Sequence, residues 1–78
     1  MIFDSIEWDE ANLDHATRRG TAEEIEQAIW NADRMFRHRH DPERVLIRSV
    51  TDGGRQLAVI GQIVRDGLRP ITAWEEER

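Results

Sequence analysis

Residues 45–60 read VLIRSVTDGGRQLAVI, two runs rich in β-branched residues on either side of Asp52-Gly53-Gly54. Valine and isoleucine favour the extended backbone, and Asp-Gly between two such runs is a strong signal for a hairpin turn. The sequence therefore predicts two antiparallel strands, one over residues 45–50 and one over residues 56–60.

The chain on both sides of this hairpin extends the same sheet. Towards the C-terminus, Asp66-Gly67 separates residues 60–64 from residues 68–73, which predicts another hairpin and a further antiparallel strand. Towards the N-terminus, residues 35–40 alternate and end at Asp41-Pro42, as a strand followed by a turn does. We therefore expect a meander of about four strands.

Two helices are predicted before this meander. Asp9 is placed to cap the start of the first helix, and Gly20 to close its end in the left-handed conformation. Thr21 and Glu24 have the spacing of a capping box, which starts the second helix. The apolar residues of the second helix recur at helical spacing and form a narrow stripe: Ile25, Ala28, Ile29 and Ala32.

The chain is expected to form one α+β domain over residues 1–78. Residues 2–8 alternate imperfectly and predict a short N-terminal strand ahead of the two helices and the meander. Both helices should pack on one face of the sheet, which leaves the other face available for function. Residues 74–78, with three consecutive glutamates, are expected to be a frayed tail.

The composition points to a small protein that associates with others. Its 78 residues are 38% apolar and 35% charged, and there is no cysteine to supply disulfides or thiolate metal ligands. A core of this size favours a stabilising contact with another protein or with a second copy as a homodimer. Because neither a membrane-spanning apolar stretch nor a signal-peptide pattern occurs, we expect a cytoplasmic protein with no membrane partner.

The charge is unevenly distributed. The net charge of −5 argues against nonspecific binding of nucleic acid, because an acidic chain repels phosphates at long range. Residues 1–33 contain nine acidic residues and two arginines, whereas residues 34–71 contain eight arginines and four acidic residues. The second half of the chain is therefore basic.

Four short motifs follow one another along the chain. They are EWDEAN at residues 7–12, RGT at 19–21 followed by EEIE at 23–26, TDGGR at 51–55, and ITA at 71–73. In this order they resemble the BrnT-type toxins of bacterial type II toxin–antitoxin modules. The resemblance implies a RelE-like fold, a ribonuclease that inhibits translation without a metal or other cofactor, and a cognate antitoxin that binds the toxin.

The chain departs from that family pattern in two places. Family members usually carry a histidine before the glycine that closes the first helix, where this chain has Arg19. They usually end in arginines and a basic helix, whereas residues 74–78 here read WEEER. The alternative interpretation is a noncatalytic interaction domain, derived from such a toxin, that binds a protein partner or self-associates.

Metal-free RNA cleavage requires an acid, a base and cations around the reacting phosphate, and histidine and arginine suit these roles. The candidate catalytic residues are His15, His38, Arg48 and Arg55. The candidate RNA-binding residues are Arg37, Arg39 and Arg69. Strand alternation would place Arg37 and Arg39 on one face, shared with Arg48 if that face is the open one, while an ordinary solvated strand is the alternative. The nuclease hypothesis depends on these arginines gathering, unpaired, on the open face of the sheet.

Zinc binding is the alternative role for the histidines. His38 and His40, with His15, supply three imidazoles, but no cysteine and no well-placed acidic residue completes a ligand set. No metal site is therefore predicted.

The three tryptophans have different expected roles. Trp8 should form a hydrophobic staple with Leu13, and Trp30 adjoins the stripe of the second helix, so both are expected to be buried. Trp74 should lie beyond the last strand, where an exposed indole is a typical anchor for a protein partner.

Overall fold

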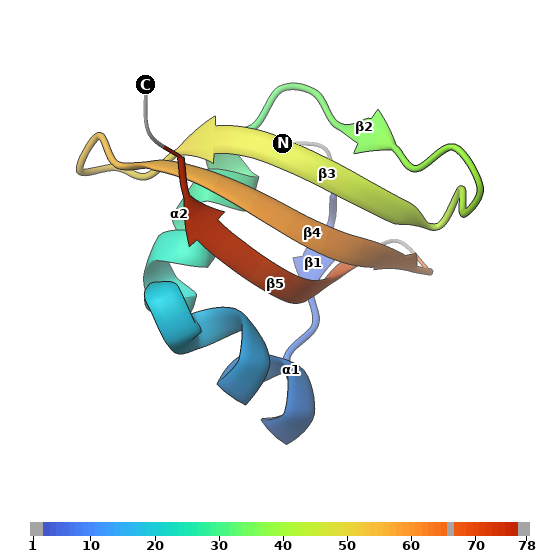
Figure 1. Ribbon diagram of the computed structural model, residues 1–78, viewed down its shortest axis with the longest axis horizontal. Helices are drawn as coiled ribbons and strands as arrows, with labels where there is room; N and C mark the ends of the chain where they lie inside the picture. The colour runs from blue at the N-terminus through green and yellow to red at the C-terminus, as the bar shows by residue number, and fades with distance from the viewer. Residues whose placement is uncertain (1–2, 66, 77–78) are drawn as a thin grey trace.

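The computed structural model describes residues 3–65 and 67–76. Its elements, in chain order, are β1 (Ser5–Ile6), helix α1 (Glu10–Ala16), the 3₁₀ turn η1 (Thr17–Arg19), helix α2 (Ala22–Asn31), β2 (Phe36–Arg37), β3 (Arg44–Val50), β4 (Gln56–Val64) and β5 (Gly67–Glu75). Both helices lie on the same side of the sheet (Figure 1). The α+β fold expected from the sequence is confirmed.

The five strands form one sheet in the order β1-β5-β4-β3-β2. Strands β2 to β5 pair antiparallel as a meander, and β1 joins them by pairing parallel to the start of β5. The register places Phe36 opposite Leu46, Leu46 opposite Ile60, and Ile60 opposite Thr72. Because directly opposed residues project from the same face, these four side chains form one row across the sheet.

The core lies between the sheet and the helices. The whole apolar stripe of α2 is buried, as its helical spacing predicts: Ile25, Ala28, Ile29 and Ala32. The facing strands bury Val45 and Ile47 from β3 and Leu57 and Val59 from β4. Each large apolar side chain buried in this way contributes roughly 1.5 to 3 kcal/mol to folding.

Both helices begin with the predicted caps. The Asp9 carboxylate accepts a hydrogen bond from the Asn12 backbone N–H at 3.0 Å, and the Asn12 side-chain oxygen accepts one from the Asp9 N–H. At the start of α2, the Thr21 hydroxyl accepts from the Glu24 N–H at 3.1 Å, and the Glu24 carboxylate accepts from the Thr21 N–H at 3.2 Å. Both capping boxes satisfy backbone donors that have no partner within the helix.

The end of the first helix differs from the prediction. Helix α1 stops at Ala16, and one 3₁₀ turn then extends to Arg19. Gly20 has φ −175° and ψ 172°, an extended conformation, so the expected left-handed closure at this glycine is wrong. Gly20 is the single residue between the 3₁₀ turn and the Thr21 cap, and an extended backbone leads directly into a cap of that kind.

The two predicted hairpins form, but their glycines have different roles. Gly54 adopts a φ of +88° in the loop between β3 and β4, which favours glycine. Gly67 instead belongs to β5, where an added Cβ would lie 2.9 Å from the Ser5 carbonyl oxygen and closer still to the Ser5 hydroxyl. The β4–β5 turn includes Arg65 at φ +55°, and Asp66 lies outside the described residues. Gly67 is thus required where β1 approaches β5.

Two strand boundaries differ from the prediction. The strand expected over residues 35–40 is limited to Phe36 and Arg37, because the chain then turns back and the Asp41 carbonyl accepts from the Arg44 N–H. Strand β5 continues to Glu75, so Trp74 lies within it rather than beyond it. The tail expected from residue 74 therefore begins as strand, and residues 77 and 78 lie outside the described part of the chain.

The first two tryptophans differ in how far they are buried. Trp8 is half-buried against the core, and its indole N–H donates to the Glu26 carboxylate at 2.7 Å. Trp30 is 38% exposed, so its expected place in the core is wrong. Ile29 occupies the centre of the buried stripe, and the next residue of a helix projects about 100° further around the axis.

Candidate functional site

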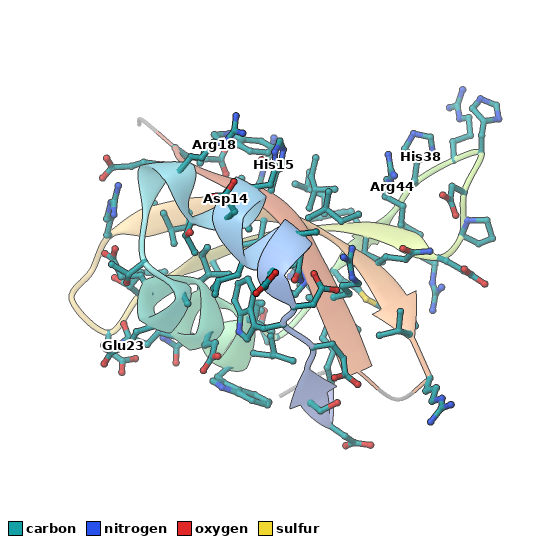
Figure 2. The ribbon with its side chains drawn as sticks, turned by 90° about the horizontal axis from the view of Figure 1, so that it is seen from below. Asp14, His15, Arg18, Glu23, His38 and Arg44 are labelled. Atoms are coloured by element: carbon teal, nitrogen blue, oxygen red, sulfur yellow. The ribbon has the colours of Figure 1, made fainter. Side chains whose placement is uncertain are left out.

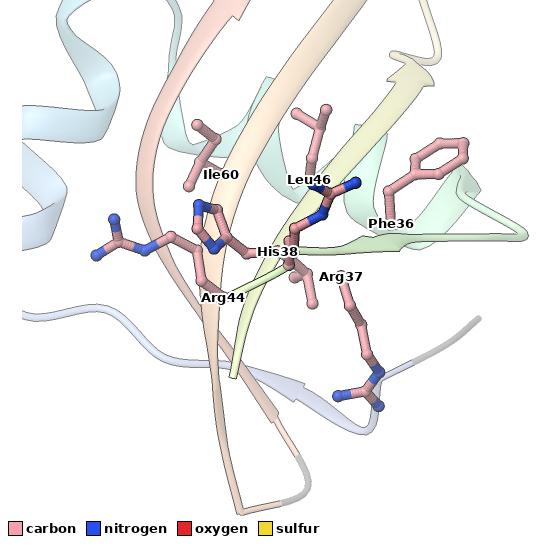
Figure 3. Close-up of a pocket in the computed structure, with 8 residues that line it drawn as sticks. Phe36, Arg37, His38, Arg44, Leu46 and Ile60 are labelled. Carbon is pink, nitrogen blue, oxygen red and sulfur yellow. The ribbon is translucent and has the colours of Figure 1, made fainter. Parts of the chain in front are cut away.

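An apolar row is exposed on the face of the sheet opposite the helices. Phe36 from β2 is 49% exposed, and Leu46 from β3 and Ile60 from β4 are half-buried beside it in the register. These three side chains, with His38 and the neighbouring arginines, line a depression of about 350 Å³ at the β2 end of the sheet (Figure 3). We call this the β2 depression.

Arginines surround the β2 depression. Arg37, Arg39 and Arg44 contribute to its lining. Arg37 points away from Leu46 and Ile60 in Figure 3, and its guanidinium donates to the Pro42 carbonyl at 2.7 Å. In residues 3–65 and 67–76, no carboxylate lies within ion-pair distance of Arg39 or Arg44. The depression therefore combines an apolar floor with positive charge that no carboxylate of the described residues neutralises by direct pairing.

Two histidines meet at the same end of the sheet. The ring centroids of His38 and His40 are 6.1 Å apart in an edge-to-face arrangement. The backbone N–H of His40 donates to His38 Nδ1 at 3.1 Å, so this nitrogen acts as an acceptor and the other ring nitrogen of His38 carries the proton when the ring is neutral. His38 lines the β2 depression directly.

The other candidate arginines are paired with carboxylates of the same chain. Arg48 lies 3.2 Å from Glu76, and Arg69 lies 2.9 Å from Asp9. Arg55 bridges Glu24 of α2 at 2.9 Å and Glu75 of β5 at 3.1 Å, so one guanidinium joins a helix, a loop and a strand. The cationic open face on which the nuclease hypothesis depends is consequently neutralised at Arg48 of β3 and at Arg69 of β5.

These ion pairs also shift the pKa values of three of their members. The Asn12 backbone N–H and then the Arg69 guanidinium hold the pKa of the Asp9 carboxyl below its ordinary value of 3.8. The Thr21 backbone N–H and then Arg55 hold the pKa of Glu24 below its ordinary value of 4.5. Hydrogen bonds from Arg55 to Glu75 and Glu24 raise the pKa of Arg55 above its ordinary value. All three shifts favour the charged forms that make the contacts.

A second hollow lies at the opposite edge of the sheet, between α1 and β5. It is lined by His15, Arg18, Thr72, Ala73 and Trp74 and has a volume of about 250 Å³. We call it the β5 hollow. Asn12, which is 3% exposed, holds α1 at this edge, because its amide donates to the carbonyls of Glu7 and Pro70 at 2.9 Å each. The β5 hollow thus brings together one imidazole, one guanidinium, one hydroxyl and one indole.

The structure separates the two candidate catalytic histidines. His15 lies on α1 beside β5, whereas His38 follows β2 at the other edge of the meander (Figure 2). Three strand spacings separate β5 from β2, about 14 Å at the usual spacing between strands. A general acid or base acts within about 3 Å of its proton, so these histidines do not serve one phosphate together.

Sequence reasoning missed part of the β2 depression. The sequence predicts only that Phe36, Leu46 and Ile60 lie on strands, and their contribution arises from the cross-strand register. Arg18 of the β5 hollow was also missed, although its spacing of three residues from His15 on a helical segment was an available signal. Trp74, expected as an exposed anchor, is half-buried in the lining of this hollow.

Two further features are absent from the part of the chain that the structure describes. No three histidine or acidic side chains gather there into a group able to hold a metal ion. None of its helices is both long and apolar enough to cross a membrane.

No protein-family model matches the chain, and no curated protein or solved structure matches it significantly. The two lined hollows and the charges around them are therefore the features that bear on the function of the chain.

Proposed function

We propose that this chain is the toxin-like member of a toxin–antitoxin pair and acts as a noncatalytic interaction domain that binds a protein partner in the cytoplasm. The observation that carries the proposal is the pairing of Arg48, Arg55 and Arg69 with carboxylates of the same chain. An RNA-binding face needs cations that are free to exchange their counterions for phosphates. A surface on which these arginines are already paired and apolar side chains are exposed elsewhere suits a protein partner better.

The partner expected from the resemblance is an antitoxin-like protein encoded beside this chain. Size-exclusion chromatography of the two proteins, alone and mixed, tests the proposal. We expect the mixture to elute as one heterocomplex, and we expect the chain expressed alone to leave cellular RNA intact. Rapid RNA breakdown by the isolated chain, with no complex formed, would contradict the noncatalytic proposal.

A metal-independent ribonuclease is the second candidate, and the β5 hollow favours it. His15 there can transfer a proton, Arg18 can face a phosphate, and Trp74 can stack on an unpaired base. Cleavage of single-stranded RNA in the presence of EDTA, abolished by His15→Gln and by Arg18→Gln but retained by Arg65→Gln, would establish this activity. Arg65 is the matched control, because it is an exposed arginine in the β4–β5 turn.

A further inference from the structure

We propose, building on the proposed function, that the β2 depression binds an acidic segment of the partner protein and takes up an apolar side chain from it. The occupant must match two features at once. The floor is an exposed apolar row, Phe36, Leu46 and Ile60, which is stabilised when an apolar group removes it from water. The surrounding Arg39 and Arg44 attract negative charge.

The charges close to the depression favour an anionic occupant. Asp41 and Glu43 are the acidic residues between β2 and β3, yet neither lines the depression. The Asp41 carboxylate instead accepts a hydrogen bond within its own loop, from the Glu43 backbone N–H at 3.1 Å. Among the residues that the structure describes, Arg39 and Arg44 therefore have no ion-pair partner next to the apolar floor, and an acidic segment would supply one.

A protein segment fits this combination better than RNA. RNA offers a regular row of phosphates, and binding it would use a spread of cations such as Arg48, Arg55 and Arg69, which are already paired. The chain also carries a net charge of −5, which repels RNA at long range but does not prevent a short-range contact with a local acidic segment. Phe36, exposed at the edge of the sheet, has the character of an interface anchor.

The probe is a short synthetic peptide in which one central leucine is flanked by glutamates. Two matched peptides serve as controls: one replaces the leucine by serine, and the other replaces the glutamates by lysines. Each is titrated into the full ¹⁵N-labelled chain and followed by NMR. We expect the glutamate–leucine peptide to shift the amide signals of residues 36–39 and 44–46 and to bind most tightly of the three. Its affinity should fall as salt is added.

Three variants test the lining. Phe36→Ala, Arg39→Glu and Arg44→Glu should each weaken binding of the glutamate–leucine peptide by about tenfold or more, as expected for an anchor and its charged neighbours. Arg65→Glu makes the same charge change outside the depression and should leave the affinity unchanged to within about twofold. Far-ultraviolet circular dichroism confirms that each variant is folded.

Several results would overturn this assignment. Equal binding of all three peptides, peptide shifts confined to the helices, or a single-stranded RNA that binds the depression more tightly than the peptide would each do so. Self-association of the free chain, abolished by Phe36→Ala, would assign the depression to a second copy instead. A heterocomplex with the adjacent gene product that is insensitive to Phe36→Ala and Arg44→Glu overturns the assignment while leaving the proposed function intact. Failure to form any heterocomplex counts against the proposed function itself.

Discussion

A single glycine controls how the N-terminal strand meets the sheet. Ser5 pairs with Gly67 in the parallel ladder between β1 and β5, and a Cβ at position 67 would lie 2.9 Å from the Ser5 carbonyl oxygen. Backbone atoms on both sides of this contact leave little room for adjustment. The requirement at Gly67 is therefore steric and comes from tertiary contact with β1.

Gly67→Ala should destabilise the protein by roughly 1 to 3 kcal/mol, the usual cost of forcing an extra methyl group into a closely packed site. Gly53→Ala is the matched control, because the nearest atom to its added Cβ is the Thr51 hydroxyl oxygen at 3.9 Å. The free energy of unfolding from urea titrations checks both variants. Equal destabilisation of the two would mean that the contact with Ser5 is not the cause.

The caps of α1 and α2 are built alike, and each connects its helix to a distant arginine. Asp9 accepts from the Asn12 backbone N–H and from Arg69 of β5, while Glu24 accepts from the Thr21 backbone N–H and from Arg55 of the β3–β4 loop. Each carboxylate must be ionised to accept all of its hydrogen bonds. Protonation should therefore weaken the caps and both long-range connections together.

We expect stability to fall in acid because the pKa values of Asp9 and Glu24 are lower in the folded protein than in the unfolded chain. The contribution of these two groups to the free energy of unfolding is complete above their ordinary pKa values of 3.8 and 4.5. It is lost as the pH falls through their lowered pKa values in the folded protein, because protons then bind the unfolded chain preferentially. Melting temperatures measured from about pH 7 to about pH 3 should show this loss. The double variant Asp9→Asn/Glu24→Gln should have a shallower acid dependence, and an unchanged slope would contradict the explanation.

The two phenylalanines lie in opposite environments, one in the core and the other on the surface of the molecule. Phe3 is 5% exposed and belongs to the core cluster, whereas Phe36 is 49% exposed on the open face of the sheet. The core of a domain of this size contributes only about 3 to 5 kcal/mol to stability. Removing one aromatic side chain from the core therefore costs a large fraction of that stability. An exposed aromatic can be removed at little cost to folding.

Phe3→Ala should lower the free energy of unfolding by about 3 to 5 kcal/mol and leave much of the protein unfolded at room temperature. Phe36→Ala should change it by less than about 1 kcal/mol. Urea denaturation monitored by circular dichroism compares the two. If Phe36→Ala is as destabilising as Phe3→Ala, Phe36 is part of the core and not a binding residue.

The sequence predicted much of the fold because its signals are local. Helical spacing identified the buried stripe of α2, the Asp9 cap and the Thr21–Glu24 capping box placed the two helix starts, and Asp-Gly marked the hairpins. The errors occurred where the local pattern was short or ambiguous: Gly20 is extended, β2 has two residues, and Trp30 is exposed.

The candidate site depended more strongly on tertiary structure. The sequence determined which side chains exist, how charge divides between the halves of the chain, and which faces of the local elements are apolar. Only the packed structure decided that Arg69 meets Asp9, that Arg55 meets Glu24, and that Phe36, Leu46 and Ile60 form a continuous row. The reason is physical: helix caps and turns depend on near neighbours, whereas ion pairing and a shared face depend on strand register and on where the helices pack.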